Sequence, residues 1–186
     1  MERQLKTDLI LFGLLLALGV LGRWFQPDWN VTPVVAVATF AGYYFRRLAV
    51  AWLVTLAVMT FSNLLLPAYD NYGVMLVVFG MFLLPAAMGR WVRGQESYAR
   101  LAICGLLPAL LFYITTNFAV WFFGTAYEPT WAGLWHCYSA ALPFFRAMLL
   151  GDLFFLAVVF GSFAACREYG WFARRELAPV RVKRRD

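Results

Sequence analysis

The sequence predicts an all-α integral membrane protein, built as a bundle of six transmembrane helices with both termini in the cytoplasm. Composition is the first reason: 63% of the 186 residues are hydrophobic and 14% are charged, whereas soluble domains carry about 25% charged residues. The second is the recurrence of apolar segments of about 17–25 residues, the length that crosses a bilayer. The third is an aromatic content of 19%, because Trp and Tyr gather at membrane interfaces.

The helices are expected at residues 8–25, 33–47, 48–66, 74–92, 101–123 and 143–166, in one membrane domain (1–172) that a basic cytoplasmic tail (173–186) follows. The first apolar run follows "MERQLK" without an A-x-A cleavage site, so it is interpreted as a retained helix rather than a signal peptide. Thr32 is a candidate cap for the second helix, and Pro33 suits its first turn. At about 15 residues this helix is too short to cross the bilayer upright, so we expect it inside the bundle or beside thinned bilayer.

Short polar runs separate the later helices. Two arginines divide the second helix from the third, "PAYDNYG" precedes the fourth, and "RGQESYAR" precedes the fifth. Pro85 is expected to bend the fourth helix. Before the sixth helix, aromatic and leucine side chains recur at helical spacing from Trp131 to Leu142, behind Thr130 as a cap. This pattern predicts a separate short helix lying at the outer interface.

Basic residues set the expected orientation, because cytoplasmic segments are enriched in Lys and Arg. With six spans and an internal N-terminus, the outer loops hold only Arg23 and Arg146, and every other basic residue falls on the inner side. Five spans would lose this asymmetry. The net charge of +6 is therefore explained by the membrane surface, and nucleic acid is not an expected partner.

Metal, cofactor and catalytic motifs are not found in the sequence. Three cysteines lie far apart without a CxxC pair, which argues against a zinc site or a disulfide framework. His136 is the only histidine and stands beside Cys137, but a metal site needs three or four ligands. Neither cobalamin nor haem has support from this spacing. No Ser-His-Asp set, HExxH motif or phosphate loop is present, so we do not expect an enzyme.

Two charges inside the apolar sixth helix point to a site in the outer half. Arg146 lies in the first turn, where its side chain can reach the interface, and Asp152 lies about 9 Å deeper. Six residues turn a helix by about 240°, so the two side chains do not share a face. An ionisable group at the depth of Asp152 is costly and marks a functional site by default. A structural tie to a neighbouring helix is the equal alternative.

Further candidates come from the other outer segments. Asn117 and Trp121 are four residues apart on one face of the fifth helix, although Asn117 alone fits a helix–helix tie better. The tryptophan and histidine of the short outer helix have an interfacial anchor as their alternative. The candidate ligand-binding residues are Trp29, Asn30, Asn117, Trp121, Trp135, His136, Arg146 and Asp152. On the first helix, Gly13 and Ala17 begin a small-residue stripe that suits close helix contact, either within the bundle or with a partner protein.

Three segments resemble a group of uncharacterised bacterial membrane transport proteins: "NVTPVVAVATFAGYYF" (30–45), "TTNFAVW" (115–121) and "GLWHCYSAALPFFRAMLLGD" (133–152). That group is similar to the S components of energy-coupling-factor (ECF) vitamin transporters. The resemblance implies a six-helix, multi-pass protein of the bacterial cytoplasmic (inner) membrane that holds one vitamin-like molecule near its outer face. It also implies that Gly13 and Ala17 contact an ATP-driven transmembrane coupling module, although "GLLLA" departs from an Ala-rich pattern. Related chains often carry an acidic residue where Asn63 stands, so a changed ligand preference or a lost tie to an arginine is expected there.

The first functional hypothesis is a membrane-embedded binding protein for a small molecule, acting in uptake. Arg146 would meet an anionic group, Asp152 and Asn117 would orient the ligand, and aromatic rings would stack on it. Its partners would be the ligand, membrane lipid, and either a coupling module or a second copy. A structural or accessory subunit of a larger membrane complex is the second hypothesis, and an intramembrane enzyme using His136 and Asp152 is the third. A polar-lined cavity in the outer half favours the first, and solid packing there favours the second.

Overall fold

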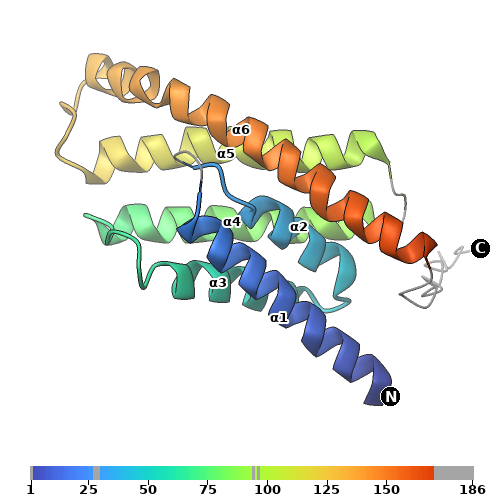
Figure 1. The fold of residues 1–186 in the computed structure, drawn as a ribbon. Helices are drawn as coiled ribbons and strands as arrows, with labels where there is room; N and C mark the ends of the chain where they lie inside the picture. Colours follow the sequence, from blue (N-terminus) through green and yellow to red (C-terminus); the bar gives the residue numbers. More distant parts are fainter. Residues whose placement is uncertain (1, 27–29, 94, 96, 170–186) are drawn as a thin grey trace, which may run out of the picture.

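The computed structural model describes residues 2–26, 30–93, 95 and 97–169, and within them the chain forms six α-helices. They are α1 (Glu2–Trp24), α2 (Val34–Tyr44), α3 (Leu48–Ser62), α4 (Tyr72–Val92), α5 (Tyr98–Phe123) and α6 (Trp131–Glu168). Figure 1 shows that successive helices run in alternating directions, so the start of α1 and the end of α6 lie at the same end of the bundle. We call this the inner end and the opposite one the outer end, after the predicted orientation. The all-helical architecture with six helices is confirmed for these residues.

The predicted short interfacial helix before the sixth span is wrong as a separate element. α6 runs without a break from Trp131 to Glu168 and contains Pro143 in its interior. The prediction placed a boundary at this proline, because proline removes a helix hydrogen bond and usually kinks or ends a helix. Thr130 does cap the helix as expected, and its hydroxyl accepts a hydrogen bond from the amide of Gly133 at 3.1 Å.

Contacts with α5 explain why the N-terminal part of α6 continues through the proline. The hydroxyl of Tyr113 donates to the carbonyl of Tyr138 at 2.7 Å, and the hydroxyl of Tyr138 donates to the carbonyl of Ile114 at 2.6 Å. The rings of Tyr113 and Phe145 also pack at 4.8 Å between centroids. These contacts hold the chain on both sides of Pro143 against α5, so tertiary packing outweighs the local preference.

The other helix boundaries differ by smaller amounts. α2 and α3 end before the predicted residues 47 and 66, while α1 and α5 begin before residues 8 and 101. The link between α2 and α3 has extended backbone at Phe45 (ψ 129°) and Arg47 (ψ 118°). Helical dihedrals therefore end at Tyr44, and the two arginines form a connection rather than helix.

α2 is the centre of the bundle, as expected for so short a helix. Every residue from Val34 to Tyr43 is buried. Glycines bring α2 and α4 together: a Cβ added to Gly42 would lie 1.8 Å from the carbonyl oxygen of Ala86, and one added to Gly89 would lie 1.9 Å from the carbonyl oxygen of Thr39. Because no side chain fits at either place, the two backbones are in direct contact.

The inner end of α2 is capped by an arginine that follows α4. Arg93 donates from Nε to the carbonyl of Tyr43 at 2.7 Å and from Nη2 to the carbonyl of Gly42 at 2.6 Å, and it also donates to the carbonyl of Phe45. The last carbonyls of a helix lack intrahelical donors and carry partial negative charge. Arg93 supplies donors and positive charge to them, which stabilises the end of α2 inside the protein.

Four helices, α1, α4, α5 and α6, are long and apolar enough to cross a membrane. α2 and α3 have 11 and 15 residues, or about 16 and 22 Å of helix, against a hydrocarbon core of about 30 Å. Large apolar side chains such as Leu9, Leu76 and Phe154 are exposed on the outside of the long helices. Contact with lipid would account for this exposure, as expected for a helical membrane protein.

Candidate functional site

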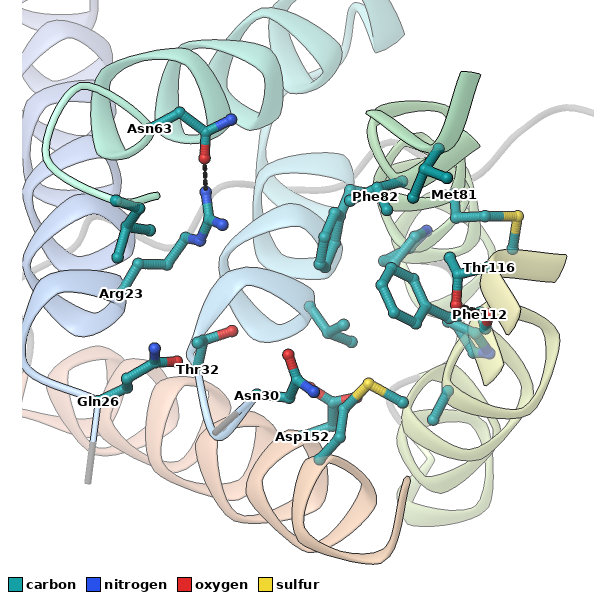
Figure 2. Close-up of a pocket in the computed structure, with 18 of the residues that line it drawn as sticks. Arg23, Gln26, Asn30, Thr32, Asn63, Met81, Phe82, Phe112, Thr116 and Asp152 are labelled. Atoms are coloured by element: carbon teal, nitrogen blue, oxygen red, sulfur yellow. Dashed lines mark hydrogen bonds between the residues drawn. The ribbon is translucent and has the colours of Figure 1, made fainter. Parts of the chain in front are cut away.

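A cavity of about 360 Å³ lies in the outer half of the bundle, within the range of small-molecule sites, which begins at about 300 Å³. It forms where α2 starts and α3 ends, so residues of the adjoining connections meet the sides of α1, α4, α5 and α6 (Figure 2). Its polar lining comprises Arg23, Gln26, Asn30, Thr32, Asn63, Tyr69, Thr116 and Asp152, and its apolar lining includes Val35, Val78, Met81, Phe82, Phe112 and Met148.

Arg23, at the end of α1, supplies positive charge to one wall of the cavity. Its Nη1 donates to Ser62 Oγ at 2.5 Å and to Asn63 Oδ1 at 2.9 Å. The indole of Trp24 donates to the carbonyl of Ser62 at 2.9 Å, so two neighbouring residues attach α1 to the end of α3. Within the described residues the guanidinium forms no ion pair with a carboxylate. Arg23 is therefore held in place by neutral groups and keeps its charge available to the cavity.

Asp152, in the middle of α6, supplies a carboxyl group to the cavity from a different helix. The residue is 2% exposed, and its Oδ2 has no hydrogen-bond partner within the described residues. Next to it, a Cβ added to Gly151 would lie 2.9 Å from a methyl carbon of Val31. The glycine lets α6 approach the segment before α2, which places Asp152 at the cavity wall (Figure 2). Buried polar groups normally have partners, so this oxygen requires an explanation.

Asn30 comes from the connection between α1 and α2 and has a left-handed backbone, with φ at 66°. Asparagine adopts this conformation more readily than most residues, because its short polar side chain can bond locally. Figure 2 shows the Asn30 side chain beside Asp152, with Arg23 and Asn63 on another wall. The cavity therefore has two separate polar regions, one at Arg23 and one at Asp152.

Apolar and aromatic groups make up the remaining walls. The rings of Phe82 on α4 and Phe112 on α5 pack at 5.2 Å between centroids with an interplanar angle of 49°. Val35, Val78 and Met148 add aliphatic surface. An apolar enclosure with a few placed polar groups is the usual character of a small-molecule site.

The structure brings together only part of the predicted site. Asn30 and Asp152 line the main cavity, and Asn117 lines an adjoining hollow of about 140 Å³ that shares Asn30 with it. The amide of Asn117 donates to the carbonyl of Tyr113 one turn earlier at 2.7 Å, so it bonds within α5 rather than across helices. Trp29 lies outside the described residues.

Four predicted site residues lie away from the cavity. Trp121 donates its indole N–H to the carbonyl of Glu128 at 2.9 Å, and Trp135 is 77% exposed. The remaining two are His136, whose ring packs edge-on against Tyr127 at 5.6 Å, and Arg146, which is exposed. Arg146 and Asp152 lie on different faces of α6, as the six-residue spacing predicted. Asp152 is buried and faces inward, whereas Arg146 is exposed and faces outward. Arg146 therefore does not supply the cavity with positive charge.

Sequence reasoning missed Arg23 as a site residue. The sequence places Arg23 among the few basic residues of the outer loops. A basic residue at a helix end usually indicates the orientation of the helix in the membrane rather than a binding site. The partners of Arg23 lie 39 and 40 residues away in the chain, and no periodic pattern encodes such a contact. The available signal was Asn63, which the resemblance related to an arginine. The structure shows that Asn63 keeps a hydrogen bond to an arginine rather than losing it.

The small-residue stripe of α1 divides into two faces. Gly19 and Gly22 pack inside the bundle, where added Cβ atoms would lie 2.6 Å from Val58 and 2.3 Å from Pro33. Gly13 and Ala17 are exposed, and a Cβ on Gly13 would meet nothing within 4 Å. The glycines of the stripe near the outer end of α1 therefore pack inside the bundle. Gly13 and Ala17 instead form an exposed surface without large side chains.

No cluster of three metal-ligating side chains occurs within the part of the chain that the structure describes. Cys137 is buried and its thiol donates to the carbonyl of Asn117 at 3.4 Å, whereas the adjacent His136 turns to Tyr127. The two neighbours thus face different surroundings and do not combine into a ligand pair.

Fold and cavity together define a class: an all-helical protein with four helices long and apolar enough to cross a membrane, and with a partly polar cavity in one half of its bundle. The sequence places it further. The chain belongs to a family of unknown function, DUF6580, whose family model matches residues 3–174. No curated protein and no solved structure shows significant similarity to it.

Proposed function

We propose that the chain is a membrane-embedded binding protein for a small molecule, acting in uptake, and that the outer cavity is its ligand site. The observation that carries the proposal is Asp152. Its Oδ2 is buried without a partner and belongs to a residue that lines a cavity of ligand size. An unsatisfied buried acceptor costs about 1–3 kcal/mol, and a ligand that donates to it removes this cost. A tie to a neighbouring helix, the structural alternative, would require a partner for this oxygen.

The proposed arrangement in the membrane has six crossing or partly crossing helices, with both termini in the cytoplasm of a bacterium and the cavity toward the outside. The distribution of basic residues supports this orientation. α2 would remain within the protein interior, where the long helices shield its ends from lipid. α3 would meet lipid on the face that exposes Leu53 and Phe61. The resemblance of the sequence to S components of ECF transporters implies a ligand held near the outer face, and a cavity in the proposed outer half fits that expectation and supports uptake as the role.

A structural or accessory role in a larger membrane complex is a second candidate, and the exposed Gly13 and Ala17 are the observation that favours it. Small residues on an outward helix face permit close approach by another membrane helix. The two roles are compatible, because a coupling module could use this same face. We do not propose an enzyme, because His136, the expected partner of Asp152 in catalysis, packs against Tyr127 and does not line the cavity.

A thermal-shift screen of the purified full chain in lipid nanodiscs tests the proposal. Vitamins, nucleobases and amino acids are added separately, and unfolding is followed by tryptophan fluorescence. We expect at least one compound to raise the melting temperature of the wild type and to lose this effect on Asp152→Asn. The matched control is Asp8→Asn, because Asp8 lies at the inner end of α1 and accepts from Gln4 and Tyr44, which an asparagine oxygen can also do.

The ligand hypothesis fails if no compound of the screen stabilises the wild type. It also fails if a stabilising compound acts equally on Asp152→Asn, because the cavity residue would then take no part in binding. Equal loss of the shift in the Asp8→Asn control would point to general destabilisation, and would count against a specific site at Asp152.

A further inference from the structure

We infer that the cavity is built for a zwitterionic ligand, one that carries an anionic group and a protonated amine at separate positions. This inference rests on the proposed function and names the substrate class of the same site. It follows from the positions of Arg23 and Asp152, one cation and one carboxyl group, which enter the cavity from α1 and α6.

The anionic group belongs at Arg23. Ser62 and Asn63 both accept hydrogen bonds from its Nη1, and the side chain of Tyr69 also bonds to the guanidinium, which has five N–H donors in all. The remaining donors and the positive charge suit a carboxylate, which arginine binds in a planar, two-pronged geometry. The neighbouring Gln26 and Thr32 also line this region and offer neutral donors to the same group.

The amine belongs at Asp152. Oδ2 can only accept when the carboxyl group is ionised, it lacks a partner, and Asn30 beside it is neutral (Figure 2). A ligand without an anionic group would leave Arg23 without a counter-charge, and a ligand without a donor would leave Asp152 Oδ2 without a partner. A zwitterion compensates both, while Phe82 and Phe112 contact its apolar centre.

A charge-deletion series on the ligand tests the inference in the wild type. The zwitterions 6-aminohexanoate, 8-aminooctanoate and 4-(aminomethyl)phenylacetate are compared with hexanoate, hexylamine, octanoate, octylamine, 4-methylphenylacetate and 4-methylbenzylamine. Dissociation constants are measured by titration of the nanodisc-embedded full chain. We expect one zwitterion to bind at least about tenfold more tightly than both of its singly charged counterparts, the ratio that a charged hydrogen bond supplies.

Variants of the protein test which residue binds the amine of the ligand and which binds its anionic group. Asp152→Asn should remove the advantage of the zwitterion over the acid, and Arg23→Gln should remove its advantage over the amine. Arg146→Gln is the matched control for the arginine, because Arg146 is the other outer basic residue and is exposed; its selectivity should equal that of the wild type. Since Arg23 also joins α1 to α3, Arg23→Lys keeps the charge if Arg23→Gln does not fold, and it should keep the preference for zwitterions.

Two failures can be told apart. If the singly charged or uncharged compounds bind as tightly as every zwitterion, the zwitterion inference is overturned while a small-molecule site remains. If neither this series nor the wider screen yields any binding, the proposed function fails and the inference fails with it.

Discussion

Replacing Asp152 with leucine is expected to stabilise the ligand-free protein while it abolishes ligand binding. The carboxyl oxygen Oδ2 is buried and unpartnered, so the folded state carries a desolvation cost of about 1–3 kcal/mol that leucine does not have. Leucine is larger than aspartate, but the adjoining cavity leaves space for the added atoms. For a chain of this length, 1 kcal/mol corresponds to about 2–4 °C, which predicts a rise in melting temperature of roughly 2–12 °C.

The assay is thermal unfolding of wild type and Asp152→Leu in the same nanodiscs, without and with a stabilising compound. Thr39→Val is the matched control, because Thr39 Oγ1 is also buried without a partner but does not line the cavity. It should raise the melting temperature and leave ligand binding intact. A drop of several degrees in Asp152→Leu would refute the reasoning, since breaking a buried charged tie costs about 3–5 kcal/mol. Asp152 would then be a structural brace.

Three further predictions address packing, capping and orientation. Gly42→Ala should destabilise the protein by about 3 kcal/mol or more in thermal unfolding, because its Cβ would overlap a carbonyl of α4. Gly13→Ala, with open space around it, should stabilise the protein by up to about 1 kcal/mol, because alanine favours the helix over glycine. Equal effects of the two substitutions would contradict the α2–α4 contact. Arg93→Gln should cost more than about 2 kcal/mol in the same measurement, because several helix-end carbonyls lose a charged donor, and an unchanged melting temperature would contradict this. In intact spheroplasts, a membrane-impermeant maleimide should label Asp70→Cys but not Glu168→Cys, and the reverse pattern would invert the orientation.

The sequence identified a residue of the cavity lining where the free-energy cost of burial depends on that residue alone. Asp152 could be selected because a carboxyl group in an apolar helix is costly wherever its neighbours lie. The burial of α2 could be predicted from its length, because so short a helix cannot cross the bilayer upright. Arg23 and Arg146 could not be ranked in this way, because which arginine faces the cavity depends on the rotation of α1 and α6 about their axes. That rotation is set by long-range packing, such as Gly151 against Val31.

Pro143 is a second place where local reasoning was insufficient. Proline predicts a helix boundary from its own geometry, and the aromatic segment before it fits an interfacial helix. Tyr113 and Tyr138 overrule this preference by bonding α5 to α6 on the N-terminal side of the proline. Both tyrosines are present in the sequence, but their pairing spans 25 residues and could not be read from spacing along one helix.

The packing of the inner half of the bundle bears on how the proposed ligand could be released. Phe40 packs edge-on against Phe160 and Phe163 at 5.3 and 5.0 Å between centroids. At the same end Arg93 occupies the carbonyls that end α2. The side chains that these contacts join on this side of the cavity are mainly aromatic, so they offer a bound molecule little polar surface toward the inner end. If the cavity serves uptake as proposed, inward release would require α2 or α6 to move, and that movement would need a source outside the bundle. The exposed small-residue surface of α1 at Gly13 and Ala17 is where such a driving partner would reach it.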